Sequence, residues 1–282
     1  MSPRHPAALR HSLRTLVTLT LGCGLTMAAA TAHAGRPCDS RQPPSASTVQ
    51  QALNLAERTH HALNASAAQV VVLARAGQDL SRYGLRYSHL GLAYRQANET
   101  GRPVWRVLHK LNQCGSDVAH LYRQGLAEFF MDDLWRFEAA WVKPSPEVQA
   151  HLLALLHDPT RTAQLHRQPY SMVSYAWGEK YQQSNQWAIE TLAASMLPES
   201  DASPVTRLQA QTWLRSRGYQ PSVLRIGALT RLGGRITAAN VAFDDHPAEK
   251  RFSDRIETVT VDSVFSWLIR AGLAQQGVAT QR

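Results

Sequence analysis

Apolar positions along the chain follow helical spacing in some segments and strand spacing in others. Val49, Leu53, Ala56 and Leu63 fall near one face at helical spacing, which predicts a first helix over residues 48–64. Runs rich in β-branched or aromatic residues predict strands at 69–74, 87–94, 103–111 and 135–142. The turn-forming residues between the second and third runs predict a hairpin.

Helical patterns dominate the rest of the chain. Helices are predicted at 116–125, 147–157, from Pro159 onward, 184–196 and 205–217. A final helix, capped by Asp262, is predicted to run to about Ala271. A late strand is expected at 255–261. This order of elements predicts an α+β fold, in which helices flank an antiparallel sheet. We expect a single such domain over residues 48–273, followed by a C-terminal tail, 274–282.

The N-terminus has the three parts of a secretory signal peptide. Its leader holds three arginines and no acidic residue before Asp39, an apolar run follows at Leu16–Ala30, and Ala32-His33-Ala34 is a small-x-small cleavage pattern. The run is shorter than the roughly 20 residues that span a bilayer, which disfavours the alternative of a membrane anchor. A lipoprotein signal ending at Cys23 is a second alternative. We expect cleavage near Ala34 and a periplasmic or secreted protein.

Charge and composition narrow the choice of partners. Removing residues 1–34 removes three arginines and no acidic residue, so the formal charge falls from +9 to +6. No block of Lys or Arg stands out, so we expect no nucleic-acid partner. The positive balance suits either an anionic envelope surface or an ordinary solvated exterior. Residues 35–47 are polar and Pro-rich, as in a linker, and no later apolar run predicts stable membrane insertion.

Two cysteines, Cys38 and Cys114, remain after the expected cleavage. In an oxidising compartment such a pair predicts a disulfide, here one that ties the N-terminal segment to the domain. Buried free thiols or a reactive Cys114 are the alternatives. The spacings CxxC, HxxxH and HExxH are absent, so the sequence predicts neither a metal site nor a cofactor.

Two histidines in neighbouring predicted strands are candidates for chemistry. His89 shares a strand face with Tyr87 and Gly91, because side chains alternate across a strand. His109 lies in the next strand, and a hairpin would place the two imidazoles side by side, where one can orient the other. The alternative is that His89 is a hydrogen-bonded core residue without a catalytic role.

The third candidate is the helix that opens at Ser184. A nucleophile at a helix N-terminus is assisted by free backbone N–H groups and by the helix dipole. Ser184 can equally be a simple N-cap, with Asn185 an ordinary first-turn residue. If a substrate binds near these groups, the candidate binding residues are Asp79, Tyr87, Asn185 and Trp187.

Two other groups of residues each have a structural and a functional interpretation. Asp244-Asp245-His246-Pro247 can be a metal or acid–base cluster, but adjacent strand residues face opposite sides, which favours a turn. Four aromatic residues can line a groove for a sugar or peptide or simply pack on the sheet: Tyr170, Tyr175, Trp177 and Tyr181.

Several blocks resemble a bacterial family, domain of unknown function 2145, which carries no settled activity. They are distributed over most of the chain after residue 34 and are Arg75–Ser81, Tyr87–Gly91, Leu111–Gly115, Tyr181–Trp187, Asn240–Pro247 and Glu257–Val264.

A more distant resemblance is to the circularly permuted papain-like hydrolases, which include NlpC-type cell-wall peptidases and lecithin–retinol acyltransferase. Gly77-Gln78-Asp79-Leu80 resembles their Gly-Asp-Leu turn with one inserted residue, and Ser88-His89-Leu90-Gly91 resembles their strand with the catalytic histidine. The resemblance implies a permuted papain-like fold, His89 as general base and His109 as its orienter. The chain departs from the pattern where the nucleophilic cysteine should open a helix, since Ser184 or Asn185 stands there.

The leading hypothesis is therefore an exported envelope protein with a papain-like, hydrolase-derived cleft. It would hydrolyse or transfer an amide, peptide or acyl group, with peptidoglycan as one possible partner. Ser184 would be the nucleophile and Cys114 the alternative nucleophile. The second hypothesis is a catalytically inactive periplasmic binding or assembly factor on the same fold. A third is a structural periplasmic domain without a small ligand.

Overall fold

The computed structural model describes residues 43–132, 134–198, 204–274 and 278–281. The predicted signal peptide, 1–34, most of the predicted linker and Cys38 lie outside the described residues.

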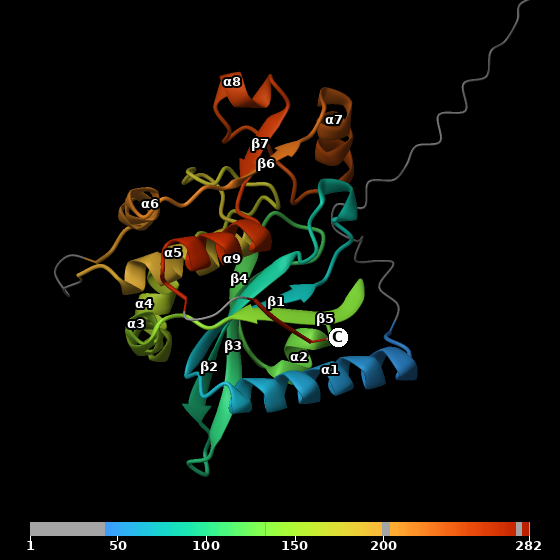
Figure 1. Ribbon diagram of the computed structural model, residues 1–282. Helices are drawn as coiled ribbons and strands as arrows, with labels where there is room; N and C mark the ends of the chain where they lie inside the picture. The colour runs from blue at the N-terminus through green and yellow to red at the C-terminus, as the bar shows by residue number, and fades with distance from the viewer. Residues whose placement is uncertain (1–42, 133, 199–203, 275–277, 282) are drawn as a thin grey trace, which may run out of the picture. The chain divides into compact units, whose positions relative to one another are not determined.

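A six-stranded sheet forms the centre of the domain (Figure 1). Its strands are β1 (Val70–Ala76), β2 (His89–Ala97), β3 (Pro103–Asn112), β4 (Ala119–Gly125), β5 (Arg136–Val142) and β8 (Ala279–Gln281). Their order is β4-β3-β2-β1-β5-β8, and every neighbouring pair is antiparallel. The predicted α+β class with an antiparallel sheet is confirmed.

Each face of the sheet is covered by its own helices, because alternate residues of the central strands point to opposite sides. On β2, Leu90 and Leu92 pack in one apolar cluster with α3 (Pro146–His157), α5 (Ser184–Ser195) and α9 (Val261–Arg270). Ala93 packs in the other cluster, with α1 (Ala46–Ala65) and α2 (Leu126–Phe130). Among the described helices, none has the length and apolar character needed to cross a membrane.

A second, two-stranded sheet pairs β6 (Ser222–Arg225) with β7 (Arg255–Thr258). It has its own small core, built around Ile226, Val241, Phe243 and Ile256. The remaining elements are the short η2 (Ser81–Tyr83), α4 (Pro159–Gln164), α6 (Arg207–Ser216), α7 (Ala228–Thr237) and α8 (Ala248–Arg251).

Three local predictions were wrong. Residues 116–125 were expected to form a helix, but β4 occupies most of them, because the free edge of β3 supplies backbone partners along its length. The expected tail, 274–282, contains β8, which pairs with β5. Thr260, rather than Asp262, caps α9, since its side chain accepts a hydrogen bond from the backbone of Ser263.

β2 and β3 approach each other closely at Gly91. A Cβ at this position would overlap Val107 Cγ1 and lie 3.2 Å from the Phe129 ring and 3.4 Å from His109 Cβ. Val107 and Phe129 are both fully buried in the cluster under α1 and α2. The strand therefore requires glycine here for close packing, which the sequence pattern alone does not reveal.

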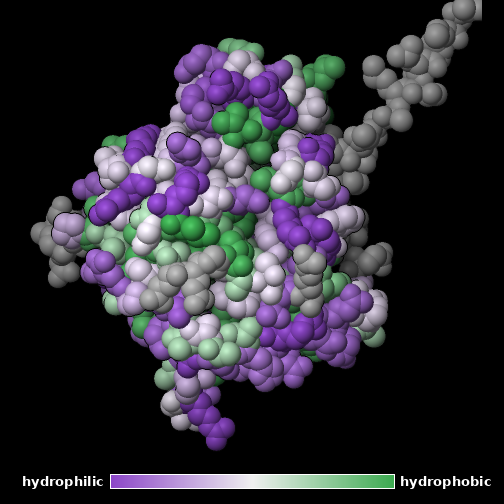
Figure 2. Space-filling view, in the orientation of Figure 1, coloured by the Kyte–Doolittle hydropathy of each residue, from purple (hydrophilic) through white to green (hydrophobic). Residues whose placement is uncertain are grey.

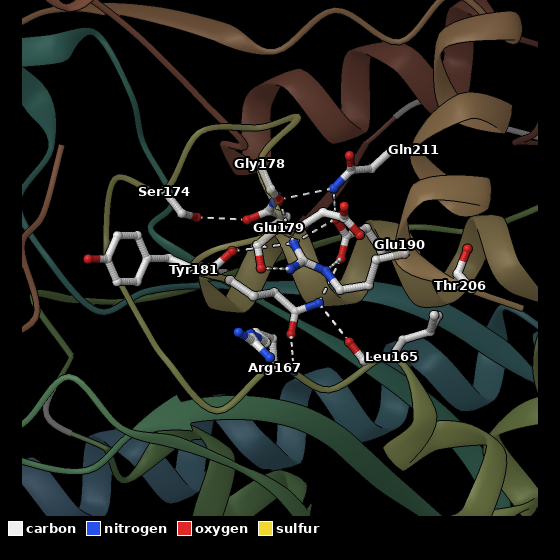
Figure 3. A network of polar contacts seen from close by, with 12 residues as sticks. Leu165, Arg167, Ser174, Gly178, Glu179, Tyr181, Glu190, Thr206 and Gln211 are labelled. Atoms are coloured by element: carbon white, nitrogen blue, oxygen red, sulfur yellow. Dashed lines mark hydrogen bonds and ion pairs between the residues drawn. The ribbon is translucent and has the colours of Figure 1, made fainter. Parts of the chain in front are cut away.

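A buried carboxylate joins α5 to α6. Glu190 accepts hydrogen bonds from Arg207 (Nε–Oε2, 2.8 Å), Gln182 (2.6 Å) and Gln211 (2.7 Å). The Arg207 guanidinium also donates to three backbone carbonyls of the segment that precedes α5, those of Gly178, Glu179 and Tyr181 (Figure 3). Charge and hydrogen-bonding capacity are thus matched inside the core, as a buried ion pair requires.

Gln182 extends this network to the sheet. Its side-chain oxygen accepts from Lys110 Nζ (2.9 Å) and from the backbone N–H of Arg167 (2.9 Å). Lys110 is fully buried on β3, and burial together with the nearby Arg207 lowers its pKa to about 6, while Glu190 opposes the shift. The network fixes the segment before α5 against both α6 and β3.

Gly91→Ala should lower the free energy of unfolding by about 1–3 kcal/mol, because an overpacked core must shift to admit the methyl group. Urea unfolding measures this. Gly233→Ala in α7 is the matched control, since an added Cβ there meets no atom within 4 Å. An equal loss in both variants would contradict the packing role of Gly91.

Arg207→Met should cost about 3–5 kcal/mol of stability, because it leaves the Glu190 carboxylate buried without its cation. The double variant Arg207→Met with Glu190→Leu should cost clearly less than the sum of its single changes. Urea unfolding of all three variants gives the coupling energy. Lys180→Met is the control, as it breaks the more exposed pair with Asp244 and should cost at most about 1 kcal/mol. Simple additivity in the double variant would show that the ion pair is not coupled.

Candidate functional site

His89 and His109 meet between the sheet and α2. His89 Nε2 lies 2.9 Å from His109 Nδ1, and His109 Nε2 lies 2.8 Å from Gln124 Oε1. Both imidazoles contact the ring of Phe129 in α2. The hairpin of β2 and β3 brings the two histidines together, and β4 supplies Gln124.

The hydrogen bonds that link His89, His109 and Gln124 all run in one direction. The carboxamide oxygen of Gln124 can only accept, so His109 Nε2 carries the proton. Neutral His109 then accepts at Nδ1 from His89 Nε2–H, which leaves the lone pair of a neutral His89 on its Nδ1. This is the arrangement of a base and its orienting partner.

Arg75 lies beside the histidine pair and weakens its basicity. It is directly opposite His89 in the β1–β2 register, and its guanidinium contacts Asp132 and the backbone carbonyl of Phe129. Burial first, and then the charge of Arg75, lower the pKa of His89 well below its ordinary value. The same two causes lower the pKa of His109 to about 4.

A base of such low pKa is poorly suited to catalysis at neutral pH, where an effective general base has a pKa near the working pH. Only 9% of His89 is exposed, and His109 is fully buried. The pair can hold its proton positions firmly but accepts a further proton reluctantly. Its geometry is that of a catalytic dyad and its electrostatics are those of a core hydrogen-bond chain.

Ser184 belongs to a helix that packs on the other face of the sheet. It opens α5, which packs with Leu90 and Leu92, whereas His89 faces α2. Ser184 lies beside the buried phenol of Tyr170. Burial raises the pKa of Tyr170, and the interaction with Ser184 opposes the shift. Among the described residues, no hydrogen bond joins Ser184 to His89, whose ring contacts His109 and Phe129.

Asn185 completes the edge of β2 where β3 diverges from it. Its Oδ1 accepts from the backbone N–H of Leu90 at 2.8 Å, and its Nδ2 donates to the carbonyls of Ser88 at 3.3 Å and Val259 at 3.4 Å. The side chain amide thus imitates a neighbouring strand. Asn185 is buried and its hydrogen-bonding groups serve the fold.

The other predicted site residues lie apart from the histidine pair. Cys114 is disulfide-bonded, so it offers no thiol as alternative nucleophile; its expected partner, Cys38, is outside the described residues. Trp187 is fully buried and Tyr87 is 6% exposed, both within the cluster under α5. Asp79 is exposed, and its hydrogen bond with Ser81 lowers its pKa.

The Asp244-Asp245-His246-Pro247 segment is a tethered turn. Asp244 pairs with Lys180, whereas Asp245 accepts from the Tyr175 backbone at 2.8 Å and contacts His246 Nδ1 at 3.0 Å. The two carboxylates have separate partners, in accord with the turn interpretation. Among the described residues, no three or more His, Cys, Asp or Glu side chains are grouped so as to hold a metal ion.

Two surface grooves lie away from these residues. One runs between α1, β3 and α2 and is lined by Leu53, Trp105 and Leu126 among others. The other lies beside Arg167 and Arg207. Neither is lined by His89, His109 or Ser184.

Sequence reasoning missed three members of the histidine cluster: Arg75, Gln124 and Asp132. A charged residue inside the apolar run of β1 was the available signal for Arg75, because such a residue needs a buried partner. Gln124 gave no signal once its segment was expected to be helical. Asp132 gave no clear signal, because an acidic residue between two predicted elements is most simply a loop or cap residue.

Comparison with known proteins identifies a family and no activity. The family model described as "Uncharacterized protein conserved in bacteria (DUF2145)" matches residues 62–268, which include the histidine pair and all of α5. No curated protein and no solved structure matches the chain. The match covers well over half of the sequence, and the chain belongs to the bacterial DUF2145 family.

Proposed function

We propose that this chain is an exported envelope protein that acts by binding or assembly rather than by hydrolysis. The different surroundings of His89, which contacts α2, and of Ser184, which opens a helix on the other face of the sheet, carry this proposal. A nucleophile and its general base must lie within hydrogen-bond reach, directly or through one water. Here one group faces α2, and the other faces Tyr170 beside α5.

The N-terminus of α5 supports the same proposal. In a hydrolase of the papain type, free N–H groups at this place would stabilise an oxyanion. In this chain the Asn185 N–H donates to the side chain of Gln183 at 3.0 Å, and Ser184 lies beside Tyr170. One of the donors that would serve a transition state is therefore occupied by the protein itself.

Export is the second part of the proposal. It rests on the signal-peptide pattern at the N-terminus, 1–34, and on the disulfide at Cys114, because structural disulfides persist in oxidising compartments. A periplasmic or secreted protein of this kind would meet peptidoglycan or another envelope component. The permuted papain-like ancestry proposed from the sequence would then describe the origin of the sheet and not its present activity.

A hydrolase that uses His89 alone is the second candidate function. The hydrogen-bonded chain from His89 through His109 to Gln124 favours it, since it leaves His89 Nδ1 as a positioned acceptor. Such an enzyme would act on an amide or acyl substrate with water as the nucleophile. The low pKa of the pair weighs against it.

Ser184→Ala and His89→Gln should both retain the protein's role in its own bacterium. His89→Gln keeps a donor for His109 Nδ1 but removes the base, so a binding role survives and any hydrolysis does not. The measurement is complementation of a deletion strain, with growth followed under envelope stress. In parallel, a fluorophosphonate probe should leave Ser184 unlabelled.

Loss of function in the His89→Gln strain would overturn the proposal, provided that the variant unfolds at the wild-type urea concentration. Release of soluble fragments from purified peptidoglycan by wild-type protein, absent in His89→Gln, would establish the hydrolase instead. Gly91→Ala serves as a control for phenotypes that come from lost stability alone.

Acid should destabilise the protein through its buried imidazoles. The pKa of His109 is about 4 in the folded chain against about 6.5 when unfolded, so the unfolded state binds this proton first. Stability is therefore complete above about pH 6.5 and falls towards pH 4, by about 3 kcal/mol for His109 alone. The pKa of His89 is lowered in the same direction. Urea midpoints measured against pH test this.

His109→Gln should flatten this pH dependence. His151→Gln, at an exposed position of α3, is the matched control and should leave the slope unchanged. Equal slopes in wild type and His109→Gln would show that the imidazole is not held neutral by burial.

A further inference from the structure

The apolar residues of α7 point away from the protein. Leu229, Leu232 and Ile236 are 85%, 57% and 75% exposed. Their spacing places them in one stripe along the helix. In Figure 2, apolar residues show on the surface close to where α7 lies in Figure 1.

The opposite side of α7 attaches the helix to the small sheet. Gly234 is buried, and a Cβ there would lie 3.3 Å from Val241 Cγ1. At about 3.6 residues per turn, Gly234 lies roughly opposite the apolar stripe. Arg231 also turns back, and its guanidinium contacts the Ile226 carbonyl and Asp254. These contacts fix the orientation of α7, and with it the outward direction of the apolar stripe.

Arginines outnumber acidic residues near α7, where Asp254 pairs with Arg231. The sequence holds no acidic residue between Asp201 and Asp244. Arg235 precedes Ile236 on the flank of the stripe and is exposed. Arg225 and Arg255 are directly opposite each other in the β6–β7 pair, just before α7, and both are exposed. Like charges directly opposite in a sheet are destabilising, so an anion beside them would be favourable.

We propose that α7 docks on an anionic phospholipid surface. Leu229, Leu232 and Ile236 would enter the boundary between headgroups and acyl chains, as the apolar face of an interfacial helix does. Arg225, Arg235 and Arg255 would face the phosphates. A purely apolar partner would gain nothing from these arginines, whereas an anionic bilayer uses both features.

The docking is peripheral and reversible. The helix has ten residues and three large apolar side chains, so its apolar contacts alone give weak binding and the attraction to anionic lipid has to add to them. Binding should accordingly need phosphatidylglycerol and should weaken with salt. This inference rests on the proposed function, because it names the surface that a non-catalytic envelope domain would bind.

Co-sedimentation with vesicles tests the docking. The protein that the proposed cleavage leaves, residues 35–282, is prepared identically for every variant and mixed with vesicles of phosphatidylcholine alone or with added phosphatidylglycerol. Wild type should bind the anionic vesicles at least about tenfold better than the neutral ones. The triple variant Leu229→Gln, Leu232→Gln, Ile236→Gln should lose at least about tenfold in binding, since glutamine keeps helix propensity but removes the apolar stripe. Arg235→Gln should lose about fivefold, an effect that vanishes at about 1 M salt.

Two controls match these changes in residue type. Leu208→Gln replaces an exposed leucine of α6, and Arg58→Gln replaces an exposed arginine of α1. Both should bind like wild type. Equal binding by the triple variant, or no preference for anionic vesicles, would overturn the proposal. So would a wild-type dimer in sedimentation velocity that the triple variant abolishes, because the stripe would then contact a second copy. Vesicle binding and sedimentation do not depend on enzymatic activity. A failure of the docking proposal is therefore distinct from a failure of the His89→Gln test.

Discussion

The two-residue repeat of β2 and β3 is the constraint on which the rest of the structure depends. It places His89 and His109 on the face covered by α2, and it places Leu90 and Lys110 on the face covered by α5. Turning His89 towards α5 would require a one-residue shift of register, which would carry every buried leucine of β2 to the wrong side. The apolar core therefore keeps the imidazole on the face of α2, while Asn185 at the start of α5 bonds to the backbone of the two residues that flank His89.

The burial of α5 accounts for the polar residues at its N-terminus. Every residue of this helix is buried, so its carboxylate and amide side chains need partners inside the protein. Asn185 satisfies the backbone of β2, and Glu190 binds Arg207. Gln183 caps the helix and also donates to the Val259 carbonyl. A polar cluster that suggests a catalytic centre in the sequence is, in three dimensions, the set of partners that lets a polar helix be buried.

Strong local patterns made much of this fold predictable. β1 and β3 were recognisable from their apolar residues, and α5 from its capped start. The hairpin of β2 and β3 was predicted from its turn residues, so the contact between His89 and His109 could be expected. β4 could not be, because its sequence has little strand preference and it forms on the edge that β3 offers. Nor could the position of Ser184. Alternation tells which residues share a face of a strand, but it does not tell which helix covers that face.

α7 was not predicted from the sequence, because its own helix-forming tendency is low. This low intrinsic stability is relevant to the proposed docking. Gly233 and Gly234 each cost a helix interior about 1 kcal/mol relative to alanine, and an isolated helix of this length is marginal in water. The protein holds α7 mainly through Arg231 and the close approach at Gly234, and contributes little apolar contact to it. A surface that buried Leu229 and Ile236 would add the apolar contact that the fold withholds. The stripe and the helix would then stabilise each other only when that surface is present, which is how a reversible membrane contact differs from a permanent core.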